Sequence, residues 1–283
     1  MDNVIIALCA DTHCGSSLGL IKPGGLNLHD GGTFQPSLLQ RKIWEVWDES
    51  WHKIAQARKG RRLIIVHNGD ATEGLHHGTT QVVSSRMDEH KQIHIDAMDH
   101  ALKVCKFNAG KGDSLYYVTG TEEHAGKGSE MEEDIAKDLE AVPLSDKRHT
   151  WDVIKKVIHG VQFNISHHGA RSGNTVLTDD NSMRQILKNI YFDCVNFRKP
   201  IPRYWIRAHI HKFIHADYED AQGRIEGIVL PSFQMRTGYV YKKFNDRYKP
   251  NDIGMIWVYV NADGTTSWDK NLLQIYQDEV GQW

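Results

Sequence analysis

Residues 63–73 read LIIVHNGDATE, and this stretch decides the fold. Its four apolar residues, of which three are β-branched, predict a buried strand. The strand runs into a glycine-containing tip that carries the carboxylates of Asp70 and Glu73. Open α/β folds build their sites beyond the carboxyl ends of such strands. We therefore expect Asp70 at the edge of a sheet, where polar residues from other strand ends can join it.

Polar residues follow four further expected strands. Asp11 and His13 follow the expected strand 4–10, and the segment 120–124 follows the expected strand 115–119. His167 and His168 follow the strand 161–165, and His209 and His211 follow the strand 204–208. Apolar periodicity predicts helices over 38–59, 88–107, 129–139 and 182–196. Short strands are expected at 157–159, 225–230, 254–260 and 272–276. A βαβα first half and a strand-rich second half predict one domain, residues 1–283, with two packed sheets.

The five strand ends carry histidines and carboxylates but no thiolates. Residues i and i+2 of an extended chain point to the same side, so each D-x-H or H-x-H pair can converge on one ion. Imidazole and carboxylate ligands suit Mn²⁺, Fe or Zn²⁺. The donors outnumber the needs of one tetrahedral ion, which favours two ions sharing Asp70 as a bridge.

Composition narrows the class of protein. The chain has 283 residues, of which 40% are apolar and 25% charged, as in ordinary globular proteins. A formal charge of −2 predicts no whole-molecule attraction to nucleic acid or to an anionic membrane, so such binding would need a local patch. No stretch approaches the ~18 apolar residues of a membrane span, and no secretory signal is expected. Four scattered cysteines without a C-x-x-C pair predict reduced thiols in a cytoplasmic protein.

In chain order, the motifs read D-x-H, G-D-x-x-E, G-x-x-x-H, H-H-G and H-x-H, within residues 5–211. This order resembles the calcineurin-like metallophosphoesterase family, which includes bacteriophage-encoded members. Each motif alone is weak evidence for this resemblance, whereas the five motifs in this order are strong evidence for it. The resemblance implies an α/β fold built as a four-layer α/β/β/α sandwich of two mixed sheets, with two divalent metal ions at the sheet edges.

The resemblance also implies the roles of individual residues. Asp11, His13 and His211 would hold the first ion, Asp70 would bridge, and His209 with His167 or His168 would hold the second. Mn²⁺ is the expected ion, with Fe or Zn²⁺ as alternatives. A hydroxide held between the two ions would attack phosphorus in line.

The third motif departs from the family pattern. The family usually has G-N-H-[DE], in which the Asn ligates the second metal and the His assists the leaving group. Residues 120–124 instead read GTEEH, without an Asn and with the His displaced. We expect Glu122 to substitute as the oxygen ligand. His124 keeps the catalytic role if the loop bulges.

Three residues outside the motifs are expected to bind substrate. His77 lies in a loop that could overhang the metals, and Arg171 and Arg236 could clamp phosphate oxygens. The tract 239–249 alternates aromatic and basic residues, as in single-strand binding surfaces, although a solvated hairpin explains it equally well. His90 and His94 lie at i, i+4 without the glutamate of H-E-x-x-H, so a solvated helix face is expected there.

The leading hypothesis is a metal-dependent phosphodiesterase of nuclease type, acting on a phosphoester substrate such as a nucleic acid or a nucleotide. A phosphomonoesterase, including a protein phosphatase, is the alternative among enzymes. A noncatalytic metal-binding scaffold is the alternative of another class, because the third motif is altered. Nothing in the residues sets the oligomeric state.

Overall fold

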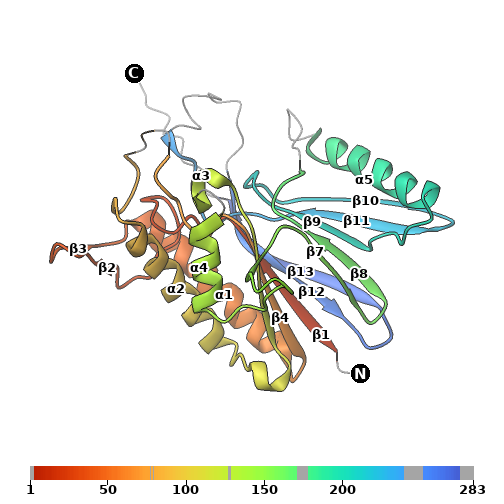
Figure 1. The fold of residues 1–283 in the computed structure, drawn as a ribbon, viewed down its shortest axis with the longest axis horizontal. Coiled ribbons are helices and arrows are strands. Elements are labelled where there is room, and N and C mark those ends of the chain that lie inside the picture. The colour runs from red at the N-terminus through yellow and green to blue at the C-terminus, as the bar shows by residue number, and fades with distance from the viewer. Residues whose placement is uncertain are drawn as a thin grey trace.

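The computed structural model describes residues 3–76, 78, 80–126, 129–170, 178–238 and 251–274. Two β-sheets form the inner layers, and helices cover their outer faces (Figure 1). This arrangement is the four-layer α/β/β/α sandwich expected from the sequence.

The first sheet has six strands. Their order is β13 (Thr266–Gln274), β12 (Asp252–Val260), β1 (Val4–Cys9), β4 (Arg62–Asn68), β5 (Ser114–Val118) and β6 (Thr150–Trp151). Strands β1, β4, β5 and β6 are parallel, and β12 and β13 extend the sheet in antiparallel fashion. The parallel strands therefore end at the same edge, which is the edge that carries the polar residues.

The second sheet has five strands. Their order is β10 (Ile214–Asp220), β11 (Gly223–Val229), β9 (Tyr204–Arg207), β8 (Val161–Ile165) and β7 (Ile154–Ile158). Strands β8, β9 and β11 are parallel, whereas β7 and β10 are antiparallel to their neighbours. The carboxyl ends of β8 and β9 thus lie side by side, and their loops carry the four histidines of the second half.

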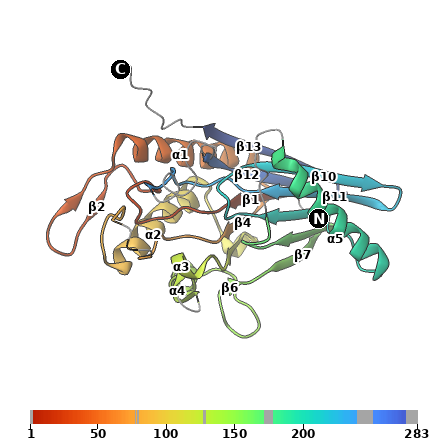
Figure 2. The ribbon, with the colours of Figure 1, turned by 90° about the horizontal axis from the view of Figure 1, so that it is seen from above.

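Helices cover both outer faces. Figures 1 and 2 show α1 (Leu38–Arg58) beside β12 and β13, and α5 (Asp179–Asn196) across β10 and β11. The layer of α1 also holds α2 (Met87–Val104) and α4 (Glu130–Asp138). Helix α1 begins at a capping box, in which Ser37 and Gln40 each accept a bond from the other's backbone N–H. The remaining short elements are β2 (Leu26–Asn27), β3 (Thr33–Phe34), the 3-10 turn Ala109–Lys111 and α3 (Glu122–Ala125).

The alternation of side chains along the strands separates three apolar layers. In β1, Ile5, Ala7 and Cys9 pack under α1 and α2, whereas the residues between them pack against the second sheet. In β9, Ile206 faces the first sheet and Trp205 faces α5. Each strand therefore contributes to two layers at once, which fixes the register of its polar end.

Most expected elements are confirmed, with small shifts at their ends. Strand β10 was not expected, because its sequence, IHADYED, is largely polar. Strand β13 begins at Thr266, six residues before the expected start at Leu272. All four cysteines are free, and three of them are buried. Among the described residues, no helix is both long and apolar enough to cross a membrane.

Candidate metal centre

The five polar strand ends meet at one edge of the sandwich. Backbone bonds tie the first two loops together, because Asp11 N donates to Gly69 O at 3.0 Å and His13 N donates to Asp70 O at 3.1 Å. The two sheets are joined at the same edge, where His209 N donates to Asp11 Oδ2 at 3.2 Å. Main-chain contacts therefore hold the loops that carry the expected metal ligands close together, although the side chain of Glu122 lies apart from the others.

Five of these residues have left-handed backbone conformations. The φ angles are 51° at Asp11, 42° at His13, 53° at Asp70, 77° at His209 and 52° at His211. Such angles are uncommon outside glycine and cost on the order of 1–3 kcal/mol each, so their concentration here marks a functional edge. The expectation that each D-x-H or H-x-H pair converges on one ion along an extended chain was wrong, because the chain is sharply turned at both pairs. Asp11 and His13 still meet in one donor group, whereas His209 and His211 lie in different groups.

The first donor group is Asp11, His13 and His211. His13 Nε2 lies 3.0 Å from His211 Nε2, and Asp11 Oδ1 lies 3.3 Å from His211 Nε2. Two ligands held about 2.1 Å from one ion lie about 3.0–3.4 Å apart at octahedral or tetrahedral angles. These separations fit a shared divalent ion.

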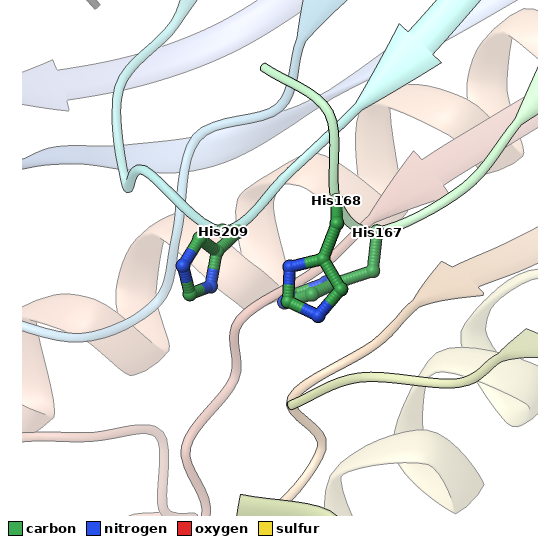
Figure 3. Close-up of side chains that lie close together, drawn as sticks. All are labelled: His167, His168 and His209. Atoms are coloured by element: carbon green, nitrogen blue, oxygen red, sulfur yellow. The ribbon is translucent and has the colours of Figure 1, made fainter. Parts of the chain in front are cut away.

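The second donor group consists of three imidazoles, those of His167, His168 and His209. Figure 3 shows the first two on the loop after β8 and the third on the loop after β9. One ligand atom from each ring lies within 4.8 Å of the others. His167 is buried, whereas His168 and His209 are exposed. The structure thus brings both members of the His-His pair to the same place.

Asp70 lies between the two groups. Its Oδ2 is 3.1 Å from His167 Nε2, 4.0 Å from His13 Nε2 and 3.9 Å from His209 Nδ1. The side chain is 1% exposed, and Thr121 fixes it through bonds of 2.7 Å from its backbone N–H and its hydroxyl. One carboxylate is therefore within reach of ligands from both groups, as a bridge requires.

The electrostatics of the centre fit a bound cation. Asp11 Oδ1 and His167 Nε2 are buried and make no hydrogen bond within the described part of the chain. Burial opposes a charge on His167, but the carboxylate of Asp70 outweighs burial and raises its pKa to about 10. Buried carboxylates call for compensating positive charge, and a metal ion can take the place of this proton.

A ring of outer partners orients the histidines. His13 Nδ1 lies 3.1 Å from Glu73 Oε2, which also accepts a 2.6 Å bond from Gln234. His211 Nδ1 is 3.2 Å from the Asn251 amide, and His167 Nδ1 donates to Asn68 O at 2.6 Å. Such partners fix which ring nitrogen can face a metal. Glu73 therefore orients His13.

The third motif folds into the helical turn α3. Each helical residue is rotated by about 100° from the last, so the turn directs Glu122 and His124 to opposite sides. His124 lies against His13, with ring centroids 4.4 Å apart, and its Nδ1 donates to Glu73 O at 2.6 Å. Burial, and then the neighbouring His13, lower the pKa of His124 to about 4. The turn is the bulge that returns the displaced histidine to the centre.

Glu122 takes no part in these donor groups. It is exposed and lines a hollow of about 420 Å³ together with Thr119, Arg148 and Asp152. The residue that follows Gly120, where the family has its Asn, is Thr121, and its hydroxyl is bonded to Asp70. The expectation that Glu122 replaces the amide ligand finds no support in this geometry.

Two buried groups beneath the centre were missed from the sequence. Glu132 accepts bonds from Gly120 N at 2.6 Å and Ala71 N at 3.1 Å, so it joins the loops that follow β4 and β5. Burial, and then Asp70, raise its pKa to about 7. No pattern distinguishes Glu132 from its neighbours in the sequence EMEED, because its role depends on which face of α4 is buried.

His94 belongs to the second of these groups. Its Nδ1 lies 3.1 Å from the hydroxyl of Thr12, and its Nε2 lies 2.8 Å from the hydroxyl of Tyr117. Thr12 also donates to Ala71 O at 2.8 Å, so the network fixes the D-x-H loop to the Asp70 loop. The expected solvated face at His90 and His94 was wrong, because both side chains are fully buried.

The expected substrate-binding residues are less completely placed. His77 and Arg171 lie outside the described residues, as does the basic and aromatic tract 239–249. Arg236 is 4% exposed and follows the segment 232–235, which bonds to the loops after β1 through Phe233 N to Asp11 O and Met235 N to Leu18 O. These three assignments stay predictions.

Comparisons with known proteins yield only distant likenesses. No protein-family model and no curated protein matches the chain. Among solved structures, Vps29 from Entamoeba histolytica, crystallised with Zn²⁺, is 8% identical with a TM-score of 0.37, over 95% of this chain and 98% of that one. A predicted phosphoesterase from Streptococcus pneumoniae is 10% identical with a TM-score of 0.33, over 95% and 99% of the two chains.

A third likeness is to a larger protein. The sulfate thiohydrolase SoxB of Thermus thermophilus, in complex with glycerol, is 8% identical with a TM-score of 0.38. The match covers 97% of this chain and 57% of that one. TM-scores below 0.5 are too low to transfer any chemistry, so the function must be inferred from the site itself.

Proposed function

We propose that this chain is a calcineurin-like metallophosphoesterase that hydrolyses phosphodiesters at a centre of two divalent ions. The observation that carries the proposal is the position of Asp70, a buried carboxylate within 4.0 Å of His13 and of His167, which belong to different donor groups. The ordered motifs of the sequence support the same assignment. The sheet-to-sheet core supports treating residues 1–283 as one domain.

Two divalent ions bound here would activate a water molecule and neutralise charge on the phosphoryl oxygens. The protein residues supply the geometry. Asp11, His13 and His211 hold one ligand set, and Asp70 joins it to the histidines that follow β8 and β9. Glu73 and Asn68 fix the ring orientations, so the ligand atoms are in place before substrate arrives.

His124 is the residue proposed to exchange a proton with the leaving oxygen. A carbonyl only accepts, so the bond to Glu73 O requires the proton of His124 to be on Nδ1. Nε2 is then the atom that can face a substrate. Because the ring is neutral, Nε2 takes up a proton before it can donate one to the departing group.

The test is a substrate panel with the purified chain loaded with Mn²⁺ or Zn²⁺. Turnover of bis(p-nitrophenyl) phosphate or single-stranded DNA above that of p-nitrophenyl phosphate supports the phosphodiesterase. Faster turnover of the monoester replaces it with a phosphomonoesterase. Bound ions without turnover of any substrate replace it with a metal-binding scaffold, which is the alternative favoured by Thr121 at the position of the family's Asn.

A further inference from the structure

The second donor group has an unusual composition for a centre of this kind. Its three members, His167, His168 and His209, offer only imidazole nitrogens. Their ring centroids are 4.8 Å, 4.8 Å and 5.3 Å apart, and Figure 3 shows His209 beside His168, with His167 behind His168 in this view. The first group, by contrast, contains the carboxylate of Asp11 beside two histidines.

Position 121 lacks the amide side chain that ligates the second metal in the family pattern. An Asn at this position would offer a carbonyl oxygen, but Thr121 uses both its N–H and its hydroxyl proton on the carboxylate of Asp70. Glu122 faces away on the exposed side of α3. Neither residue offers the amide carbonyl oxygen that the family pattern places here.

The backbone favours the alternative ligand. Gly169 has a φ of 107°, a conformation open to glycine, so the chain turns immediately after His168. His168 is exposed, and its ring packs edge-on against both His167 and His209. One of its ring nitrogens already lies within 4.8 Å of a nitrogen of each of the other two rings.

We propose that His168 supplies the third imidazole of the second ion, in the place of the missing amide, and that this position therefore selects Zn²⁺ over Mn²⁺. Imidazole ligands suit Zn²⁺, whereas carboxylate and carbonyl oxygens suit Mn²⁺. The first position, with its carboxylate from Asp11, accepts either ion. This inference rests on the proposed two-ion centre and specifies which ion its second half holds.

The experiment equilibrates the metal-free protein with equal concentrations of Zn²⁺ and Mn²⁺ and measures the bound ions. Titration calorimetry gives each affinity, and zinc-edge X-ray absorption counts the imidazoles. In the wild type we expect Zn²⁺ at the second position. His168→Ala should weaken one Zn²⁺ site by about tenfold or more and leave the other unchanged. Thr121→Asn in that background should restore an oxygen ligand and raise the share of Mn²⁺.

His52→Ala is the matched control, because His52 is an exposed histidine on α1 that pairs with Asp48. Its metal affinities should equal those of the wild type. Thermal unfolding of the metal-free His168→Ala protein should match the wild type, since an exposed ring contributes little to folding.

Three results would overturn the inference. If His168→Ala binds both ions as the wild type does, His168 is no ligand, although the two-ion centre stands. If the variant loses only turnover, His168 contacts substrate instead. If the wild type prefers Mn²⁺ at both positions, the selectivity argument fails. A wild type that binds no ion, or only one, would instead refute the proposed function itself.

Discussion

The loops of the six-stranded sheet and those of the five-stranded sheet bring different groups to the centre. The first set contributes Asp11, His13 and Asp70, none more than 1% exposed. The second contributes only histidines, and the side chain of His209 is 45% exposed. The loops of the first sheet, which form the buried half, thus carry the negative charge and the carboxylate that lies between the two groups. The loops of the second sheet offer further imidazole donors, of which His167 is buried and His168 and His209 are exposed.

The largest expected effect comes from the shared carboxylate. Asp70→Asn keeps the shape of the side chain but removes the charge that joins the two groups. We expect the loss of at least one bound ion and a fall of more than about a hundredfold in phosphodiester turnover, measured together with metal content. Asp263→Asn, on an exposed turn, is the control. Full activity of the Asp70 variant would remove the distinction between the two halves.

A smaller effect is expected from the partner of His13. Glu73→Gln keeps the hydrogen-bonding shape but removes the charge beside His13 Nδ1, which lies 3.1 Å away. Loss of such a partner lowers metal affinity by about 10- to 100-fold, which titration with Zn²⁺ would measure. An unchanged affinity would show that metal binding by the buried half does not depend on the residue that orients His13.

The sequence predicted which strand ends meet at the centre, but it did not predict the backbone conformation of the loops there. Asp11, His13, Asp70, His167, His209 and His211 are recognisable because each lies within a few residues of the end of an expected strand. The helical turn Glu122–Ala125 was not recognisable from the sequence, because four residues are too few to show a periodicity that separates the buried face from the exposed one. The roles of Glu132 and His94 depend on packing between elements distant in sequence, and no local pattern reports that.

The stability of the folded protein should also depend on pH through the buried His94. Burial lowers the pKa of His94 from 6.5 to about 3, so the folded protein keeps this ring neutral. Below pH 6.5 the unfolded chain takes up a proton there that the folded chain does not. Stability from this group is complete above pH 6.5 and falls as pH drops toward 3, by about 1.4 kcal/mol per pH unit.

Denaturant unfolding of the wild type and His94→Gln between pH 7 and pH 4 tests this dependence. The variant should be less stable at pH 7 and should lose stability less steeply with acid. Equal slopes in the two proteins would show that His94 is not the group that titrates.

The smallest effect is expected at Glu122. This side chain is exposed and lies outside both donor groups, so Glu122→Gln should change metal content, turnover and stability by less than about twofold. The measurement is the same metal titration used for the other variants. Loss of an ion from this variant would show that Glu122 is a metal ligand and that the second ion is not held by histidines and the shared carboxylate alone.

The most direct test of the two-ion centre is anomalous diffraction from crystals grown with Zn²⁺ and Mn²⁺, collected at both absorption edges. We predict two peaks at the shared edge of the sheets, with the carboxylate of Asp70 in contact with both. Asp11, His13 and His211 should surround one peak, and the imidazoles that follow β8 and β9 the other. A single peak, or two peaks of which Asp70 touches only one, would contradict this account.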